Sequence, residues 1–126
     1  MPSFLAFDIG MRRTGVAFCD VSTRVPLPLQ TLEHTSDDEL LDAMRALVAE
    51  REAGTIVIGL PLLLSGDAGA QSRHVKALVQ KLSLAHVEVV LLDERYTTSR
   101  SSLYDGDAAA ACDLLQVFLD RKAVDK

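Results

Sequence analysis

The fold of this chain is decided by the stretch FLAFDIG at residues 4–10, together with TGVAF at residues 14–18. Two apolar runs flank a glycine-containing turn, which predicts a buried strand over 4–9 and an antiparallel return strand over 15–21. The first run contains one carboxylate, Asp8. Burying a carboxylate costs free energy unless it has a partner, and a metal ion is one such partner. Asp8 is therefore the first candidate for a metal site, with a hydrogen bond to the turn as the structural alternative.

The bulk composition is that of an ordinary soluble chain. The length of 126 residues fits one domain, expected over residues 1–126, and the charged content of 25% is typical. Apolar runs are shorter than the roughly 20 residues of a membrane span, and the first residues do not resemble a signal peptide. We therefore expect a cytoplasmic protein without membrane contact. A net charge of −5 argues against nucleic-acid binding through bulk charge, so such binding needs a local basic patch or a bridging metal.

The rest of the chain predicts one more strand of the meander and two crossover units. A short strand near 29–32, confined at its start by two prolines, is followed by a helix from a capping box at 36–39 to residue 52, ended by Gly54. Then come a strand over 55–58, a helix over 71–82, a strand over 87–92, a short helical piece after residue 98 and a last helix over 107–122. This order predicts an α/β fold with a mixed five-stranded sheet, an antiparallel meander plus two parallel strands, and helices on both faces.

Three acids stand where structure alone does not require them. Asp8 lies inside the first strand, Glu94 follows the last strand, and Asp107 opens the last helix. Active sites in such sheets gather at the carboxyl ends of strands, so these acids are expected to meet. Carboxylates clustered with open positions suit Mg²⁺ or Mn²⁺. The alternatives are a helix cap for Asp107 and a salt bridge with neighbouring arginines for Glu94; Asp113 is expected to be solvated.

Basic and small residues surround the expected site. The candidates for phosphate contacts are Arg12, Arg13, Arg73, Lys76, Arg95 and Arg100, each of which has an ordinary solvated position as its alternative. Small or rigid residues expected near the site are Gly10, Gly15, Gly59, Pro61 and Gly66. The three histidines, at positions 34, 74 and 86, are scattered, which favours surface or helix–loop positions. The two cysteines, at positions 19 and 112, lie in apolar contexts and predict buried free thiols.

These motifs together resemble the YqgF family, also called RuvX or Holliday junction resolvase-like proteins. The matching pieces are FDIGMRRTGVA at 7–17, VIGLP at 57–61 with Ser65-Gly66, DERYTT at 93–98, and Asp107 with the helix through residue 120. The resemblance implies a ribonuclease H-like fold and a divalent-metal nuclease. In that family the activity is linked to maturation of the 5′ end of pre-16S rRNA and, in some members, to branched DNA. The family's three metal-site acids fall on Asp8, Glu94 and Asp107.

One departure from the family concerns the segment before the last acid. Only twelve residues separate Glu94 from Asp107, where the family has a longer, basic segment. Should the shorter link fail to bring Asp107 in, Asp105 or Asp113 would substitute. The stretch at 62–64, Leu-Leu-Leu, is more apolar than usual and suggests a partner surface, including that of a homodimer.

Three functions fit the sequence. The first is a nuclease acting on RNA, with branched or single-stranded DNA as further substrates and ribosomal precursor particles as partners. The second is a non-catalytic RNA-binding or ribosome-assembly module that lost activity through the short segment. The third is nucleotide binding, because residues 8–15 also resemble the first phosphate loop of the actin, Hsp70 and sugar-kinase superfamily; those proteins need a second domain and a second phosphate loop.

Overall fold

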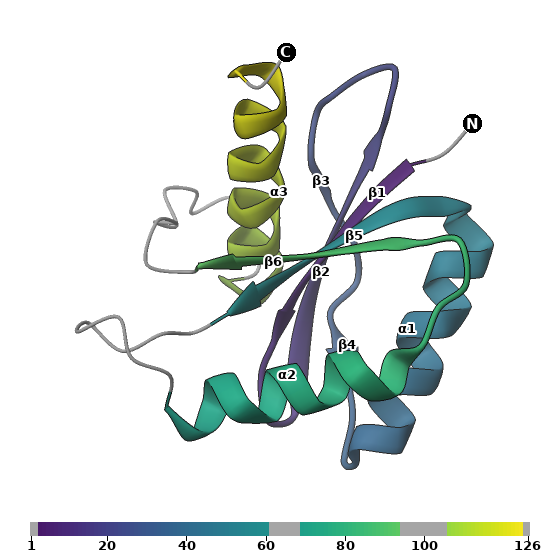
Figure 1. Ribbon diagram of the computed structural model, residues 1–126, viewed down its shortest axis with the longest axis vertical. Helices are drawn as coiled ribbons and strands as arrows, with labels where there is room; N and C mark the ends of the chain where they lie inside the picture. Colours follow the sequence, from purple (N-terminus) through teal and green to yellow (C-terminus); the bar gives the residue numbers. More distant parts are fainter. Residues whose placement is uncertain (1–2, 61–68, 94–105, 125–126) are drawn as a thin grey trace.

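The computed structural model describes residues 3–60, 69–93 and 106–124, with the side chains of the last segment described over 108–122. Its elements in chain order are β1 (Ser3–Ile9), β2 (Arg13–Asp20), β3 (Leu27–Pro28), β4 (Leu32–Glu33), α1 (Asp37–Arg51), β5 (Ala53–Leu60), α2 (Ala70–Leu82), β6 (Glu88–Asp93) and α3 (Gly106–Val124). Within these segments the predicted helices and strands are present, except that two short strands replace the single strand predicted near 29–32 (Figure 1). The helical piece predicted after residue 98 lies outside them.

The first strand is central in a mixed sheet with the order β3-β2-β1-β5-β6. It pairs antiparallel with β2, where Asp8 stands opposite Gly15, and parallel with β5, where the last pair is Phe7 with Ile58. The strand β6 continues the parallel half beside β5. Because β1, β5 and β6 run in one direction, their carboxyl ends meet at one edge of the sheet.

The third strand of the meander is split. Two two-residue strands, β3 and β4, both pair with β2, and between them the Leu29 N–H donates to the Val16 carbonyl at 2.9 Å. Two prolines, Pro26 and Pro28, lack the N–H that a continuous ladder needs. The single strand expected near 29–32 is therefore replaced by two short strands that share one place beside β2.

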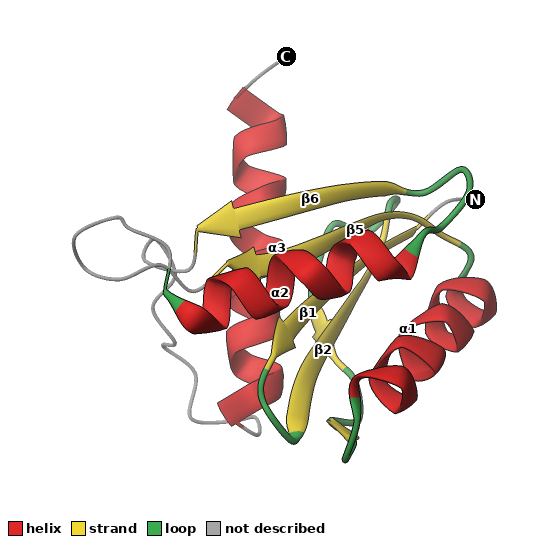
Figure 2. Ribbon diagram, turned by 60° about the horizontal axis from the view of Figure 1, so that its bottom comes forward, coloured by secondary structure: helices red, strands yellow, loops and turns green. Residues whose placement is uncertain are grey.

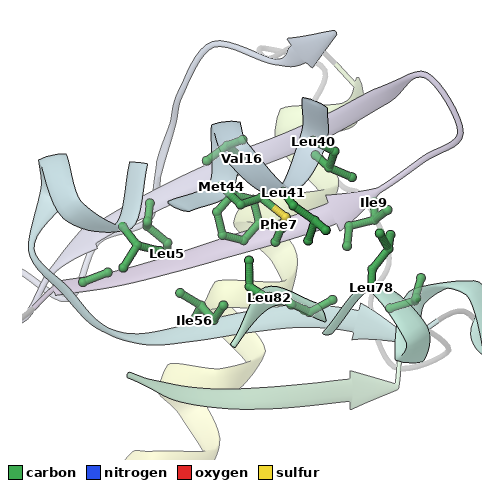
Figure 3. Packing of buried hydrophobic residues seen from close by; sticks show 14 residues of the cluster. Leu5, Phe7, Ile9, Val16, Leu40, Leu41, Met44, Ile56, Leu78 and Leu82 are labelled. Carbon is green, nitrogen blue, oxygen red and sulfur yellow. The ribbon is translucent and has the colours of Figure 1, made fainter. Parts of the chain in front are cut away.

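Helices cover both faces of the sheet, with α1 and α2 on one face and α3 on the other (Figure 2). Side chains alternate along β1: Leu5, Phe7 and Ile9 pack in the cluster under α1 and α2, whereas Phe4 and Ala6 pack in the cluster under α3. Phe7 is fully buried at the centre of the first cluster (Figure 3). Within the described residues, none of the helices is long and apolar enough to cross a membrane.

The ends of α1 have identifiable causes. The Ser36 hydroxyl accepts a hydrogen bond from the Glu39 N–H at 3.2 Å, as the capping box predicts. At the other end Glu52 adopts the left-handed conformation, with φ 53° and ψ 45°. The expectation that Gly54 ends the helix is wrong, because Gly54 already lies in β5.

The direction of α3 places its first turn at the carboxyl end of β1. The Phe4 and Phe118 rings meet edge to face with centroids 5.4 Å apart, and an Arg24 nitrogen donates to the Leu119 carbonyl at 3.3 Å. The later turns of α3 therefore lie over the amino end of β1. Figures 1 and 2 show α3 running in the opposite direction to β1, so the helix begins toward the carboxyl end of the strand, which carries Asp8.

Candidate active site at the carboxyl ends of the strands

Asp8 occupies the next-to-last position of β1 and is half-buried. It continues the alternation of Phe4 and Ala6, so it belongs to the face of the sheet that α3 covers. Its cross-strand partner is Gly15, which has no side chain. The carboxylate therefore has no side chain directly opposite it on β2, which suits an oxygen ligand for a cation.

The turn after Asp8 depends on Gly10. Its N–H donates to the Arg13 carbonyl at 3.0 Å, and a Cβ added at Gly10 would lie 2.5 Å from that same oxygen. Real Cβ atoms essentially never come closer than 3.0 Å to such an atom, so the turn requires glycine here. The two arginines of the turn, Arg12 and Arg13, are exposed. The turn thus presents two guanidinium groups directly after the strand that carries Asp8.

The other two predicted acids are placed only in part. Glu94 lies outside the described residues, and the residue before it, Asp93, is the last of β6 at the same sheet edge as the end of β1. Asp107 is the second residue of α3, inside the first turn, so the alternative in which it caps the helix from outside does not fit. Its side chain lies outside the description. Among the described side chains, no group of three His, Cys, Asp or Glu could hold a metal ion.

Some of the other predicted site residues are described by the structure, and others lie outside the described residues. Arg73 and Lys76 are exposed on α2, whose first turn is held against the end of β1 by a hydrogen bond from Gln71 Nε2 to the Ile9 carbonyl at 3.3 Å. Outside the described residues lie Arg95, Arg100, Pro61, Gly66, Asp105 and the stretch 62–64. Gly59 is buried near the end of β5.

His34 lies in the loop between β4 and α1, one of the two kinds of position expected, but it is buried and not at the surface. It is 5% exposed, and its Nε2 lies 2.9 Å from Oγ1 of Thr14, which is itself fully buried. Burial lowers the pKa of His34, with Glu39 and Asp37 opposing. Its backbone N–H donates to the Arg12 carbonyl at 2.9 Å, so this buried pair braces the hairpin turn of the site. No local pattern predicts this contact, because the pairing of β4 with β2 brings together residues twenty positions apart.

The other two histidines behave more simply. His74 is half-buried on α2, and its Nε2 lies 3.0 Å from a carboxylate oxygen of Asp37 in the first turn of α1. His86 is exposed and adopts a positive φ of 62°.

Asp113 is not solvated as expected. It is half-buried, and its Oδ2 is inaccessible to solvent. It lies about 160° from Leu115 around the helix but only four positions from Ala109, which is 1% exposed. The buried surface of α3 is therefore wider than a single stripe, and Asp113 stands at its border.

The cysteines are free thiols, as predicted. Cys19 is buried and Cys112 is half-buried. Burial raises the pKa of Cys19 and raises the pKa of Cys112 to about 11. Both side chains are therefore protonated near neutral pH.

The fold is shared with proteins whose structures were solved in complex with Holliday junctions. It matches Thermus thermophilus RuvC, solved in complex with a Holliday junction substrate, with a TM-score of 0.70 at 8% identity over 98% of this chain and 97% of that chain. It also matches the Fowlpox virus resolvase, solved with Holliday junction DNA, with a TM-score of 0.60 at 9% identity over 95% and 98% of the two chains. The chain therefore has the ribonuclease H-like fold that the sequence predicts.

Sequence relatives narrow this class to one family. Residues 2–121 match the family model RuvX, described as Holliday junction resolvase. A protein of Anaeromyxobacter sp. (strain Fw109-5) is 35% identical over 131 residues, covering 93% of this chain and 96% of its own. A protein of Polaromonas sp. (strain JS666 / ATCC BAA-500) is 34% identical over 123 residues, covering 94% and 88%. Both are named "Putative pre-16S rRNA nuclease". The chain belongs to the RuvX family.

Proposed function

We propose that this protein is a divalent-metal-dependent nuclease that hydrolyses phosphodiester bonds during maturation of the 5′ end of pre-16S rRNA. The observation that carries the proposal is Asp8, a half-buried carboxylate at the carboxyl end of the central strand, with Gly15 opposite and two exposed arginines following it. The family match and the names of the relatives support nuclease chemistry for the chain.

The residues fit a hard divalent cation. Asp8 offers a carboxylate with no side chain beside it on β2, and Glu94 and Asp107 would supply further carboxylate oxygens from the ends of β6 and α3. An all-oxygen set with open positions suits Mg²⁺ or Mn²⁺ rather than a softer metal. Such a cation, when bound, lowers the pKa of a coordinated water and stabilises negative charge on phosphate oxygens.

The chain's own cations would position the nucleic-acid backbone. Arg12 and Arg13 project from the turn after Asp8, and Arg73 and Lys76 lie on the helix docked at the same strand end. Lys and Arg contacts to phosphates fix the register of a nucleic acid without reading its sequence. This local set offsets a net charge of −5 at the one place where a polyanion must approach.

The same proposal assigns the protein a setting. We place its action in the cytoplasm, on ribosomal precursor particles, and we propose that two copies associate. The names of the relatives support the action on ribosomal precursors, and the apolar residues 62–64 support the association of two copies. Light scattering of the purified protein at several concentrations measures the association, and a monomer throughout would remove that part.

The test compares cleavage of four end-labelled substrates: a pre-16S 5′ precursor RNA, a single-stranded RNA, a single-stranded DNA and a four-way junction. Each is incubated with Mg²⁺, with Mn²⁺ or with chelator. The variant is Asp8→Asn, and the matched control is Asp120→Asn, an exposed aspartate on α3 far from the strand end. We expect metal-dependent cleavage of the precursor RNA that Asp8→Asn abolishes and Asp120→Asn retains.

Other outcomes identify the competing functions. If the wild type and the Asp8→Asn variant both bind RNA and neither cleaves it, the nuclease is refuted and the non-catalytic assembly module remains. Cleavage of the junction or of single-stranded DNA in place of RNA would keep the chemistry and change the substrate.

A further inference from the structure

A hydrogen bond between α2 and the end of β1 lies next to Asp8 in the chain. The side chain of Gln71, in the first turn of α2, donates from Nε2 to the backbone carbonyl of Ile9 at 3.3 Å. We propose that Gln71 is a positioning residue that holds the end of β1 and thereby aims the Asp8 carboxylate at the metal. This inference rests on the proposed function, since it concerns the same site.

The Ile9 carbonyl needs such a partner because of the ladder geometry. Gly10 donates to the Arg13 carbonyl, so Gly10 and Arg13 form a hydrogen-bonded pair at the tip of the hairpin. Hydrogen-bonded and non-bonded pairs alternate in an antiparallel ladder, so the next pair, Ile9 with Thr14, is non-bonded. The carbonyl of Ile9 therefore points away from β2, toward the side of β1 where β5 lies.

On that side the parallel ladder has already ended. The last pair between β1 and β5 is Phe7 with Ile58, two residues before Ile9. A backbone carbonyl left without a partner in a partly buried place costs about 1–3 kcal/mol. Within the described segments, Gln71 supplies a donor to this carbonyl, so a side chain provides the hydrogen bond that the pairing of β1 with β2 and β5 does not.

The helix that carries Gln71 is itself firmly placed. Val75 and Leu78 are buried in the core cluster, at 0% and 2% exposure. His74, one helical turn after Gln71, lies 3.0 Å from Asp37 in the first turn of α1. The amide of Gln71 therefore reaches the strand end from a rigid element, which is what precise placement of a site residue requires.

The consequence for Asp8 follows from the backbone. The Gln71 bond fixes the carbonyl of the peptide unit between Ile9 and Gly10, and the Arg13 carbonyl fixes its N–H. Both polar groups of this peptide unit are therefore held, from opposite sides of β1. Because the peptide begins one residue after Asp8, these two hydrogen bonds also restrict the backbone of Asp8. Without Gln71 only the hairpin side holds it, and the end of β1 gains freedom to rotate.

The experiment replaces Gln71 with methionine, which keeps the length and the helix propensity but removes the donor. The matched control is Gln80→Met, the same substitution at an exposed position of the same helix. Three quantities are measured: Mn²⁺ binding by electron paramagnetic resonance, hydrogen exchange of the Gly10 amide by NMR, and cleavage of the substrate identified above. Urea unfolding of each variant reports whether the fold is retained, and Gln71→Ala serves as a second variant should the methionine be poorly tolerated.

We expect Gln71→Met to weaken Mn²⁺ binding about tenfold, the lower end of the range for residues that orient metal ligands. Exchange at Gly10 should speed up, and Gln80→Met should match the wild type in every measurement. Unchanged Mn²⁺ binding and unchanged exchange in Gln71→Met would overturn this inference while leaving the nuclease proposal intact. A wild type that neither binds Mn²⁺ nor cleaves would instead remove the nuclease proposal, and the role of Gln71 with it.

Discussion

Replacing Gly10 with alanine is the most direct perturbation of the candidate site. The added Cβ would lie 2.5 Å from the Arg13 carbonyl oxygen, so that oxygen must retreat by about 0.5 Å to reach the 3.0 Å limit. The same oxygen accepts the Gly10 N–H at 3.0 Å, and an equal lengthening takes that hydrogen bond to the edge of useful geometry. Losing most of a hydrogen bond and straining the turn amounts to about 2 kcal/mol.

Urea unfolding followed by circular dichroism measures this loss. We expect the free energy of unfolding of Gly10→Ala to fall by about 2 kcal/mol, and its Mn²⁺ binding to weaken because Asp8 moves with the turn. The control is Met11→Ala in the same turn, where the methionine is 82% exposed and the change in stability should be close to zero. A Gly10→Ala loss of less than about 0.5 kcal/mol would refute the steric reasoning.

Three further predictions follow from other parts of the structure. Burial lowers the pKa of His34 in the folded protein below the ordinary 6.5, so below pH 6.5 the unfolded chain binds more protons at this residue than the folded chain does. The stability contributed by the neutral, buried His34 is therefore fully present above pH 6.5 and is lost as the pH falls toward the folded-state pKa. In His34→Gln this part of the pH dependence should disappear, and urea unfolding at several pH values showing an unchanged slope would contradict it. The thiols of Cys19, which is buried, and Cys112, which is half-buried, are protonated and should react slowly with an aromatic disulfide reagent at neutral pH until the protein is denatured; rapid labelling of Cys19 in the folded protein would contradict its burial. Ser36→Ala removes the acceptor for the Glu39 N–H and should lower the free energy of unfolding by about 1 kcal/mol, whereas no change in urea unfolding would deny the cap its role.

The sheet could be predicted because its signals are local. The apolar run around Asp8, the β-branched run ending at Ile58 and the capping box at Ser36 each specify an element through a few neighbouring residues. The direction of the parallel strands follows from the helices between them. The sequence prediction was less accurate at the ends of elements: the left-handed residue that ends α1 is Glu52 and not Gly54, and its N–H donates to the Ala49 and Val48 carbonyls of the helix.

Of the candidate site, the position of Asp8 inside the first strand could be predicted from the sequence, whereas the contacts around it could not. Asp8 stands out because a carboxylate interrupts an apolar strand, which a reader of the sequence can see. The buried pair of His34 with Thr14 and the contact of Gln71 with Ile9 join residues that only the completed sheet brings together. A periodic pattern of apolar residues does not predict these contacts, because each depends on where two different elements end in the folded sheet.

The helix α3 has a consequence for the order in which the molecule is made. Half of the buried residues in the cluster on its face come from α3 itself, and the rest come from strands completed earlier, such as Ala6, Ala17 and Val57. While the chain is being synthesised, β1, β2 and β5 can pair and α1 and α2 can cover the opposite face, yet this apolar surface stays open until the last nineteen-residue helix emerges. A nascent chain without α3 therefore exposes an apolar surface that favours aggregation. When α3 packs, the enzyme proposed here would both complete its candidate site and cover that surface.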